Sequence, residues 1–115
     1  MSADVDVAAE HGGLGGRAMT LRQLHYFVRV ARVGSINRAA GDLRVAQSAV
    51  TRQIQALEGC LGVRLLEHSA RGVRLTGDGQ RVLELGQAIV DLALQARQST
   101  AAESLHLGES AGHSP

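Results

Sequence analysis

Residues 34–62, GSINRAAGDLRVAQSAVTRQIQALEGCLG, decide the fold because they encode two short helices joined by a tight connector. Apolar positions recur at helical spacing over residues 36–43 and again over residues 47–61. Ser35 is a favourable N-cap for the first of these helices, and residues 44–46 leave room only for a turn. Two short helices with such a connector are typical of a helix-turn-helix.

The second of these helices has two different sides. Its apolar side carries Val50, Ile54, Leu57 and Leu61. Its polar side carries Gln47, Ser48, Thr51, Arg52 and Gln55, of which the first four lie in the N-terminal half. An apolar back holds a helix on its domain, while a polar front can meet base edges in the major groove of DNA. Glutamine can pair with adenine and arginine with guanine, and threonine offers a hydroxyl and a methyl group. The four polar residues are therefore predicted DNA contacts; a solvated helix face is the alternative, and for Ser48 an N-cap.

The flanking segments turn this motif into a winged helix-turn-helix. A preceding helix is predicted over residues 20–33, with Thr20 as its N-cap. Two β-prone runs, residues 64–68 and 72–75, predict a hairpin with Arg71 near its tip. An arginine there can enter a narrow minor groove, where the negative potential is enhanced, although a solvated turn is the alternative. The predicted fold class is mainly α: a three-helix core, a two-stranded wing and a long linker helix.

The linker helix is predicted over residues 77–99 and is unusually apolar. One stripe at 3–4 spacing consists of Val82, Leu85, Ile89, Leu92 and Ala96, and a second consists of Leu83, Val90 and Leu94. A helix this apolar does not lie alone on a small domain. It can pack back onto its own core, but a dimer seam uses the excess better. Two-fold symmetry would then present two recognition helices to two half-sites.

The chain divides into four segments by composition and pattern. They are a flexible N-terminal extension with four glycines (residues 1–18), the winged helix-turn-helix (19–76), the linker and dimerisation helix (77–99) and a disordered tail (100–115).

The net charge of +1 conceals a basic centre. Residues 20–81 hold ten arginines against four carboxylates, a net charge of +6, whereas residues 1–19 carry −2 and residues 82–115 carry −3. Such a module favours a polyanionic partner, here double-stranded DNA. Within it, Arg22, Arg38 and Arg74 are candidates for phosphate contacts, with plain surface positions as the alternative.

Other classes of function receive little support from the 115 residues. Cys60, the single cysteine, cannot form an internal disulfide, and the five histidines are too scattered for a metal site. A carboxylate pair or triad with usable spacing is missing, so we expect neither an enzyme nor a cofactor. We see no apolar run long enough to span a membrane and no secretory signal, so a cytoplasmic, nucleoid-associated location is expected.

An ordered series of matches resembles the LysR-type transcriptional regulators of bacteria. It covers about residues 19–85 and comprises Leu21-Arg22-Gln23-Leu24, Tyr26-Phe27, Gly34-Ser35, Arg38-Ala39-Ala40, Leu43, Val45-Ala46-Gln47-Ser48-Ala49-Val50, Arg52-Gln53-Ile54, Leu57-Glu58, Leu61-Gly62, Leu65, Arg71, Val73, Leu75-Thr76 and Gly79. The resemblance implies a winged helix-turn-helix, a linker helix that pairs antiparallel with its mate in a dimer, and regulation of transcription. It also implies DNA contacts from the four polar residues of the second helix and from Arg71.

The chain departs from the family pattern at several places. Ile36 stands where an aromatic residue is usual, and His68 stands where arginine is usual in the wing. The family usually continues into a two-lobed effector domain, so we expect no small-molecule inducer site in this chain. Alternative interpretations are a winged-helix module that binds protein, an interfering partner of a full-length relative, or a molybdate-responsive regulator with the same winged fold.

Overall fold

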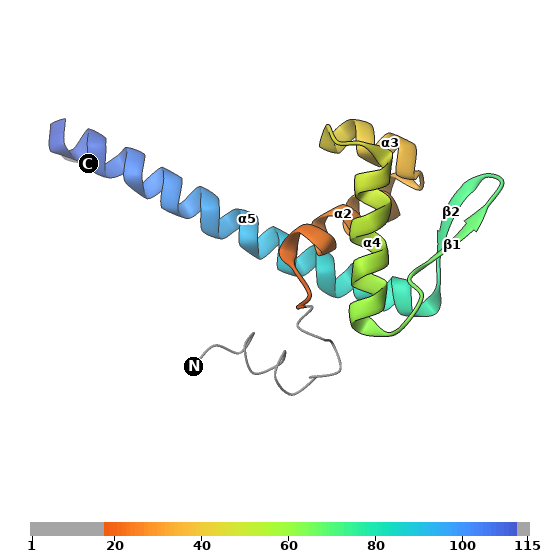
Figure 1. Ribbon diagram of the computed structural model, residues 1–115. Coiled ribbons are helices and arrows are strands. Elements are labelled where there is room, and N and C mark those ends of the chain that lie inside the picture. Colours follow the sequence, from red (N-terminus) through yellow and green to blue (C-terminus); the bar gives the residue numbers. More distant parts are fainter. Residues whose placement is uncertain (1–17, 113–115) are drawn as a thin grey trace.

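The computed structural model describes the backbone of residues 18–112 and the side chains of residues 18–100. Within that range the elements are α2 (Leu21–Val33), α3 (Ile36–Leu43), α4 (Gln47–Leu61), β1 (Leu66–Ser69), β2 (Gly72–Leu75) and α5 (Gly77–Gly112). The hairpin projects from one side of the helical core, and α5 extends from the other side (Figure 1). The predicted fold class, a mainly α winged helix-turn-helix with a linker helix, is confirmed. The predicted flexibility of residues 1–18 concerns a segment outside the described residues, except for Ala18.

The helix boundaries follow from local capping chemistry. Thr20 and Gln23 form a capping box, in which each side chain accepts the other residue's backbone N–H at 3.0 Å. Gly34 ends α2 with φ at 73°, the left-handed conformation that glycine adopts without a steric cost. The Ser35 hydroxyl then accepts the backbone N–H of Arg38 and starts α3. Short connectors therefore fix the relative orientation of α2, α3 and α4.

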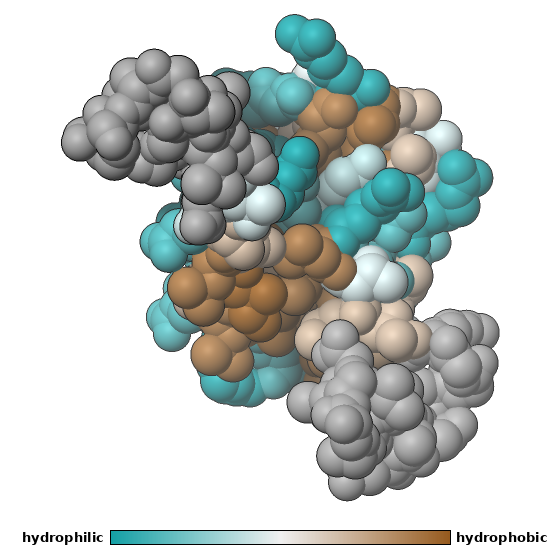
Figure 2. Space-filling model, turned by 90° about the vertical axis from the view of Figure 1, so that its left-hand side faces the viewer, coloured by the Kyte–Doolittle hydropathy of each residue, from teal (hydrophilic) through white to brown (hydrophobic). Residues whose placement is uncertain are grey.

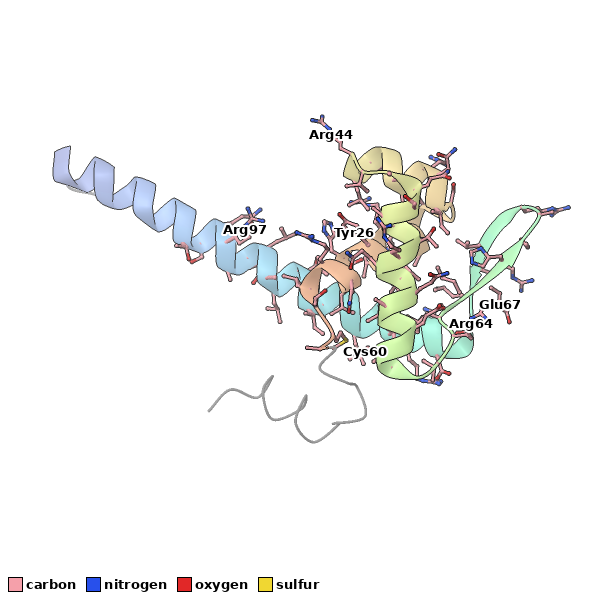
Figure 3. The ribbon with its side chains drawn as sticks, in the orientation of Figure 1. Tyr26, Arg44, Cys60, Arg64, Glu67 and Arg97 are labelled. Atoms are coloured by element: carbon pink, nitrogen blue, oxygen red, sulfur yellow. The ribbon has the colours of Figure 1, made fainter. Side chains whose placement is uncertain are left out.

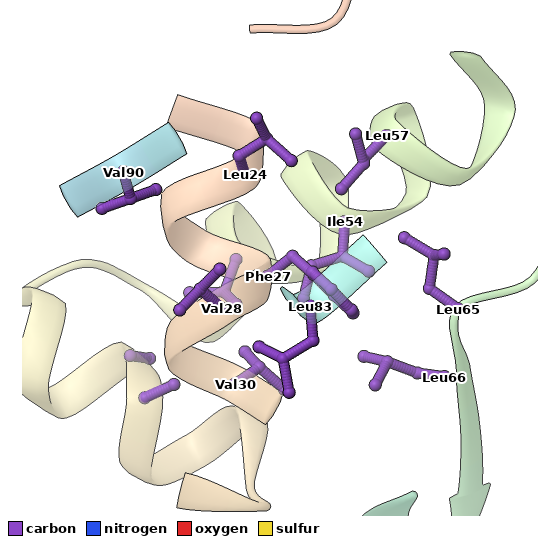
Figure 4. Close-up of a cluster of buried hydrophobic side chains, with 13 residues drawn as sticks. Leu24, Phe27, Val28, Val30, Ile54, Leu57, Leu65, Leu66, Leu83 and Val90 are labelled. Carbon is purple, nitrogen blue, oxygen red and sulfur yellow. The ribbon is translucent and has the colours of Figure 1, made fainter. Parts of the chain in front are cut away.

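The core lies where α2 meets α4, α5 and the base of the wing. Phe27 on α2 is fully buried, together with Leu57 on α4 and with Leu65 and Leu66 at the start of the wing. Figure 4 shows this cluster with side chains from α5 among its members, of which Leu83 is one. Each fully buried aliphatic or aromatic side chain contributes roughly 1.5–3 kcal/mol. The wing is thus anchored in the same core as the helices.

The wing is a two-stranded antiparallel hairpin whose first strand starts later than predicted. β1 pairs with β2 from Leu66 opposite Leu75 to Ser69 opposite Gly72. The predicted start at residue 64 is wrong, because the Leu65 backbone has other hydrogen-bond partners. Its N–H donates to a carboxylate oxygen of Glu58 at 2.8 Å, and its carbonyl accepts the N–H of Thr76 at 3.0 Å.

Helix α5 runs for 36 residues and ends at Gly112, beyond the predicted end at Ser99. Residues 100–112, for which the sequence predicts part of a disordered tail, continue this helix in the structure. The helix continues because this segment contains alanine, glutamate and leucine, which are good helix formers. The single proline of the sequence, Pro115, lies beyond it. Along the described residues, none of the helices has both the length and the apolar character that a membrane crossing requires.

Candidate nucleic-acid interface

Helix α4 turns its polar side to solvent, as the sequence predicts. Gln47, Ser48 and Arg52 are exposed and Thr51 is half-buried. Of the apolar back, Val50, Ile54 and Leu57 are buried, and Leu61 at the end of the helix is 36% exposed. The N-cap of α4 is Ala46, which has no capping oxygen, so the alternative role of Ser48 as N-cap is wrong. Ser48 instead lies in the first turn, one helical turn from Arg52. The structure therefore brings these four polar residues together on the N-terminal half of one helix.

Arg71 lies in the two-residue turn at the tip of the wing and is exposed. Its backbone N–H donates to the Ser69 hydroxyl at 3.3 Å, and that hydroxyl donates to the carbonyl of Gly72 at 3.3 Å. A further hydrogen bond joins the hairpin to the end of α2: the Val73 N–H donates to the carbonyl of Gly34 at 3.4 Å. Arg71 is thus presented at the far end of a hairpin that the core supports (Figure 1).

The three candidate phosphate contacts occupy different parts of the surface. Arg38 is exposed on α3 within the helix-turn-helix. Arg74 is exposed on β2 directly opposite Glu67, and cross-strand partners share one face of a hairpin, so a carboxylate lies beside it. Arg22 lies in the first turn of α2. This helix packs on α5, where Leu24 lies beside Gly86. Arg38 therefore belongs to the helix-turn-helix that carries the α4 surface, Arg74 belongs to the wing, and Arg22 belongs to the preceding helix.

A groove of about 360 Å³ separates α4 from the wing. It is lined by Ile36, Thr51, Ile54, Gln55, Glu58, Arg64, Leu66 and His68. Gln55 and Arg64 are not among the site residues that the sequence predicts. The signal for Gln55 was available, because it follows Gln47 and Thr51 at intervals of four residues along one helix side. Arg64 could be placed only by the fold.

Arg44 is a further exposed basic residue, and it is not among the site residues that the sequence predicts. It ends α3 in the left-handed conformation with φ at 60°, and its N–H donates to the carbonyls of Ala40 and Gly41. Figure 3 shows its side chain projecting from the end of the molecule at which α4 begins. An exposed arginine at this end adds positive charge beside the recognition helix.

The two apolar stripes of α5 have different surroundings. Leu83 and Val90 are buried against the chain's own core, whereas Leu94, which the sequence places in the same stripe, is 44% exposed. Leu85 and Leu92 are 67% and 62% exposed, and Ile89 is 41% exposed. Figure 2 shows hydrophobic residues gathered on the side of the molecule from which α5 extends.

Two members of the predicted dimer stripe differ from the rest. Val82 is half-buried and packs on the chain's own core, so it does not belong wholly to the free face. Ala96 is exposed.

In the part of the chain whose side chains are described, no group of three or more histidine, cysteine, aspartate or glutamate residues could hold a metal ion.

Comparison with known proteins agrees with this geometry. Residues 21–80 match the family described as "Bacterial regulatory helix-turn-helix protein, lysR family". The chain belongs to this family. It is 51% identical over 75 residues to the HTH-type transcriptional regulator TcbR of Pseudomonas sp. (strain P51), and the match covers 65% of this chain and 26% of the relative. It is 45% identical over 92 residues to ClcR of Pseudomonas putida, covering 79% of this chain and 31% of ClcR.

Two solved structures that resemble the fold contain DNA. The chain superposes on the CbnR_DBD–DNA complex with a TM-score of 0.68 at 45% identity, covering 75% of this chain and 99% of the CbnR chain. For the BenM_DBD/catB site 1 DNA complex the TM-score is 0.70 at 36% identity, with 75% and 97% covered. The resemblance to LysR-type regulators is thereby confirmed. The chain spans only about a quarter to a third of the lengths of TcbR and ClcR.

Proposed function

We propose that this chain binds double-stranded operator DNA as a homodimer and regulates transcription from it. The observation that carries the proposal is the exposed polar side of α4, formed by Gln47, Ser48, Thr51 and Arg52, on a buried apolar back. α4 would enter the major groove and Arg71 the adjacent minor groove. The DNA in the CbnR and BenM domain structures supports this assignment.

A mobility-shift titration with genomic promoter fragments at two salt concentrations tests DNA binding. Affinity should fall steeply as salt rises, because phosphate contacts release counterions. Arg52→Ala should weaken binding by about 1–3 kcal/mol and relax base preference. Arg97→Ala is the matched control, since Arg97 lies on α5 far from α4 and the wing (Figure 3). Unchanged binding in R52A would refute the assigned face, and no shift at low salt would favour a protein-binding module.

The dimer is tested separately on the exposed face of α5. Leu85→Glu and Leu92→Glu place a charge where the side chain is already mostly solvent-exposed, so the monomer fold should persist. Each variant should sediment as a monomer at concentrations where the parent chain is a dimer. Gln95→Glu adds the same charge at an exposed position of the same helix and should leave the dimer intact. A parent chain that is monomeric at every concentration would refute the dimer.

A further inference from the structure

We infer that the groove between α4 and the wing is a phosphate-binding site that holds the sugar–phosphate backbone of one DNA strand, with Gln55, Arg64 and His68 as its donors. This inference rests on the proposed DNA binding and adds a third contact region to the α4 face and the wing tip. Its ligand is the phosphodiester backbone rather than a base edge, so it contributes affinity and alignment without reading sequence.

The geometry of duplex DNA requires a backbone at this place. A helix in the major groove and a wing in the neighbouring minor groove lie on either side of one sugar–phosphate strand. That strand must cross the space between α4 and the hairpin. Thr51 belongs both to the predicted reading face and to the groove lining, so the two surfaces are continuous. Gln55, one turn further along α4, leads from the reading face into the groove.

The lining has an apolar floor and a polar rim. Ile54 and Leu66 are buried in the floor, whereas Gln55, Arg64 and His68 are exposed on the rim. An amide, a guanidinium and an imidazole can each donate a hydrogen bond to a phosphate oxygen. The rim therefore presents its donors from both walls, one from α4 and two from the wing side.

Two carboxylates lie near the groove, and Glu58, which lines it, offsets part of its positive charge. Glu58 is only 15% exposed, and one of its oxygens accepts the backbone N–H groups of Leu65 and Leu66 at 2.8 and 3.3 Å. The Arg64 Nε lies 3.8 Å from that same oxygen while the arginine side chain remains 72% exposed. Glu58 thus aligns Arg64 beside the groove and leaves most of its guanidinium open. Glu67 lies on the opposite face of β1 from His68, because neighbouring strand residues alternate.

The test measures the salt dependence of binding to a promoter fragment that the parent chain shifts and to an unrelated duplex. Each phosphate contact contributes about 0.9 to the slope of log K against log salt, and a substitution removes one contact from each protomer of the dimer. The slope should therefore fall by about 1.8, which corresponds to roughly 30-fold weaker binding at 0.15 M salt. Arg64→Ala should cause this loss equally on both duplexes, and Arg64→Lys should restore the slope. His68→Ala should weaken binding to both duplexes alike. Arg97→Ala should leave the slope unchanged.

A second measurement separates phosphate contact from a purely structural role of Arg64. Duplexes carrying a neutral methylphosphonate at each successive position of one strand are titrated with the parent chain and with R64A. At one position the methylphosphonate should weaken the parent chain several-fold but have no further effect on R64A. An equal loss for both proteins at every position would overturn the groove assignment while leaving DNA binding itself intact. No binding by the parent chain at low salt would instead refute the proposed function.

Discussion

Gly79 in the first turn of α5 offers a sharp test of how tightly the linker helix is joined to the wing. A Cβ atom at this residue would lie 2.1 Å from the carbonyl oxygen of Leu65 and 3.1 Å from a methyl carbon of Leu75. Leu65 is fully buried, and its carbonyl also accepts the N–H of Thr76. The obstacle is therefore backbone that is fixed on both sides, and Gly79→Ala must push α5 away from the base of the wing.

The magnitude follows from two opposing terms. Overpacking that shifts backbone costs typically 1–3 kcal/mol, and a contact this short places the cost near the upper end, about 3 kcal/mol. Alanine recovers up to about 1 kcal/mol of helix propensity over glycine. The expected net destabilisation is about 2 kcal/mol. For a domain of this size that lowers Tm by roughly 8–16 °C.

Gly77→Ala is the matched control for this experiment. The same substitution two residues earlier in the same helix meets nothing within 4 Å, and Gly77 is exposed. It should stabilise the chain by about 0.5 kcal/mol, because alanine reduces the entropy of the unfolded chain. Thermal unfolding followed by circular dichroism, with all proteins at one concentration, compares them. If G79A unfolds at the same temperature as G77A, the close approach of α5 to the wing is wrong.

Three further substitutions probe local structure. Thr20→Ala removes the capping box of α2 and should cost about 1 kcal/mol in urea unfolding, whereas Thr100→Ala, far along α5, should cost much less. Glu58→Ala removes the acceptor for the backbone N–H groups of Leu65 and Leu66 and should lower the free energy of unfolding by about 1.5–3 kcal/mol. Glu58→Gln keeps an acceptor oxygen and should lower it less. Equal losses in the two variants would contradict the hydrogen-bonding role. Arg44→Gly relieves a left-handed residue and should raise stability by about 1 kcal/mol, so a fall in Tm would contradict it.

The sequence predicts the three core helices well because their boundaries depend on local chemistry. Thr20, Ser35 and the left-handed glycines at 34 and 62 act on residues three or four positions away. α3 therefore begins at the predicted residue, and α4 ends at the predicted residue. The start of α4 at Gln47 also agrees with the prediction, although Ala46 offers no capping side chain. The polar side of α4 follows from the same periodicity, since burying Val50 and Ile54 forces the residues between them outward.

The start of the wing depends instead on partners distant in the chain. Arg64 and Leu65 look like strand residues by composition, yet the hydroxyl of Thr76 donates to the Arg64 carbonyl at 2.6 Å. Glu58, which lies on α4, accepts the backbone N–H of Leu65. Neither interaction has a periodic signature, so a sequence pattern cannot distinguish this connection from a strand. For the same reason, the sequence pattern does not identify Arg64 as a groove residue.

Helix α5 shows how geometry resolves what hydrophobicity leaves open. Successive residues of an α-helix are rotated by about 100°, so residues two apart lie on nearly opposite sides. Leu83 and Val90 face α2, and Gly86 between them lets the helices approach to within contact of Leu24. Burying that stripe turns the leucines at 85 and 92 away from the core, and no rotation of the same helix can bury both sets against one domain. Covering the exposed stripe with Leu85 and Leu92 takes a surface beyond this domain, and the proposed dimer would supply one.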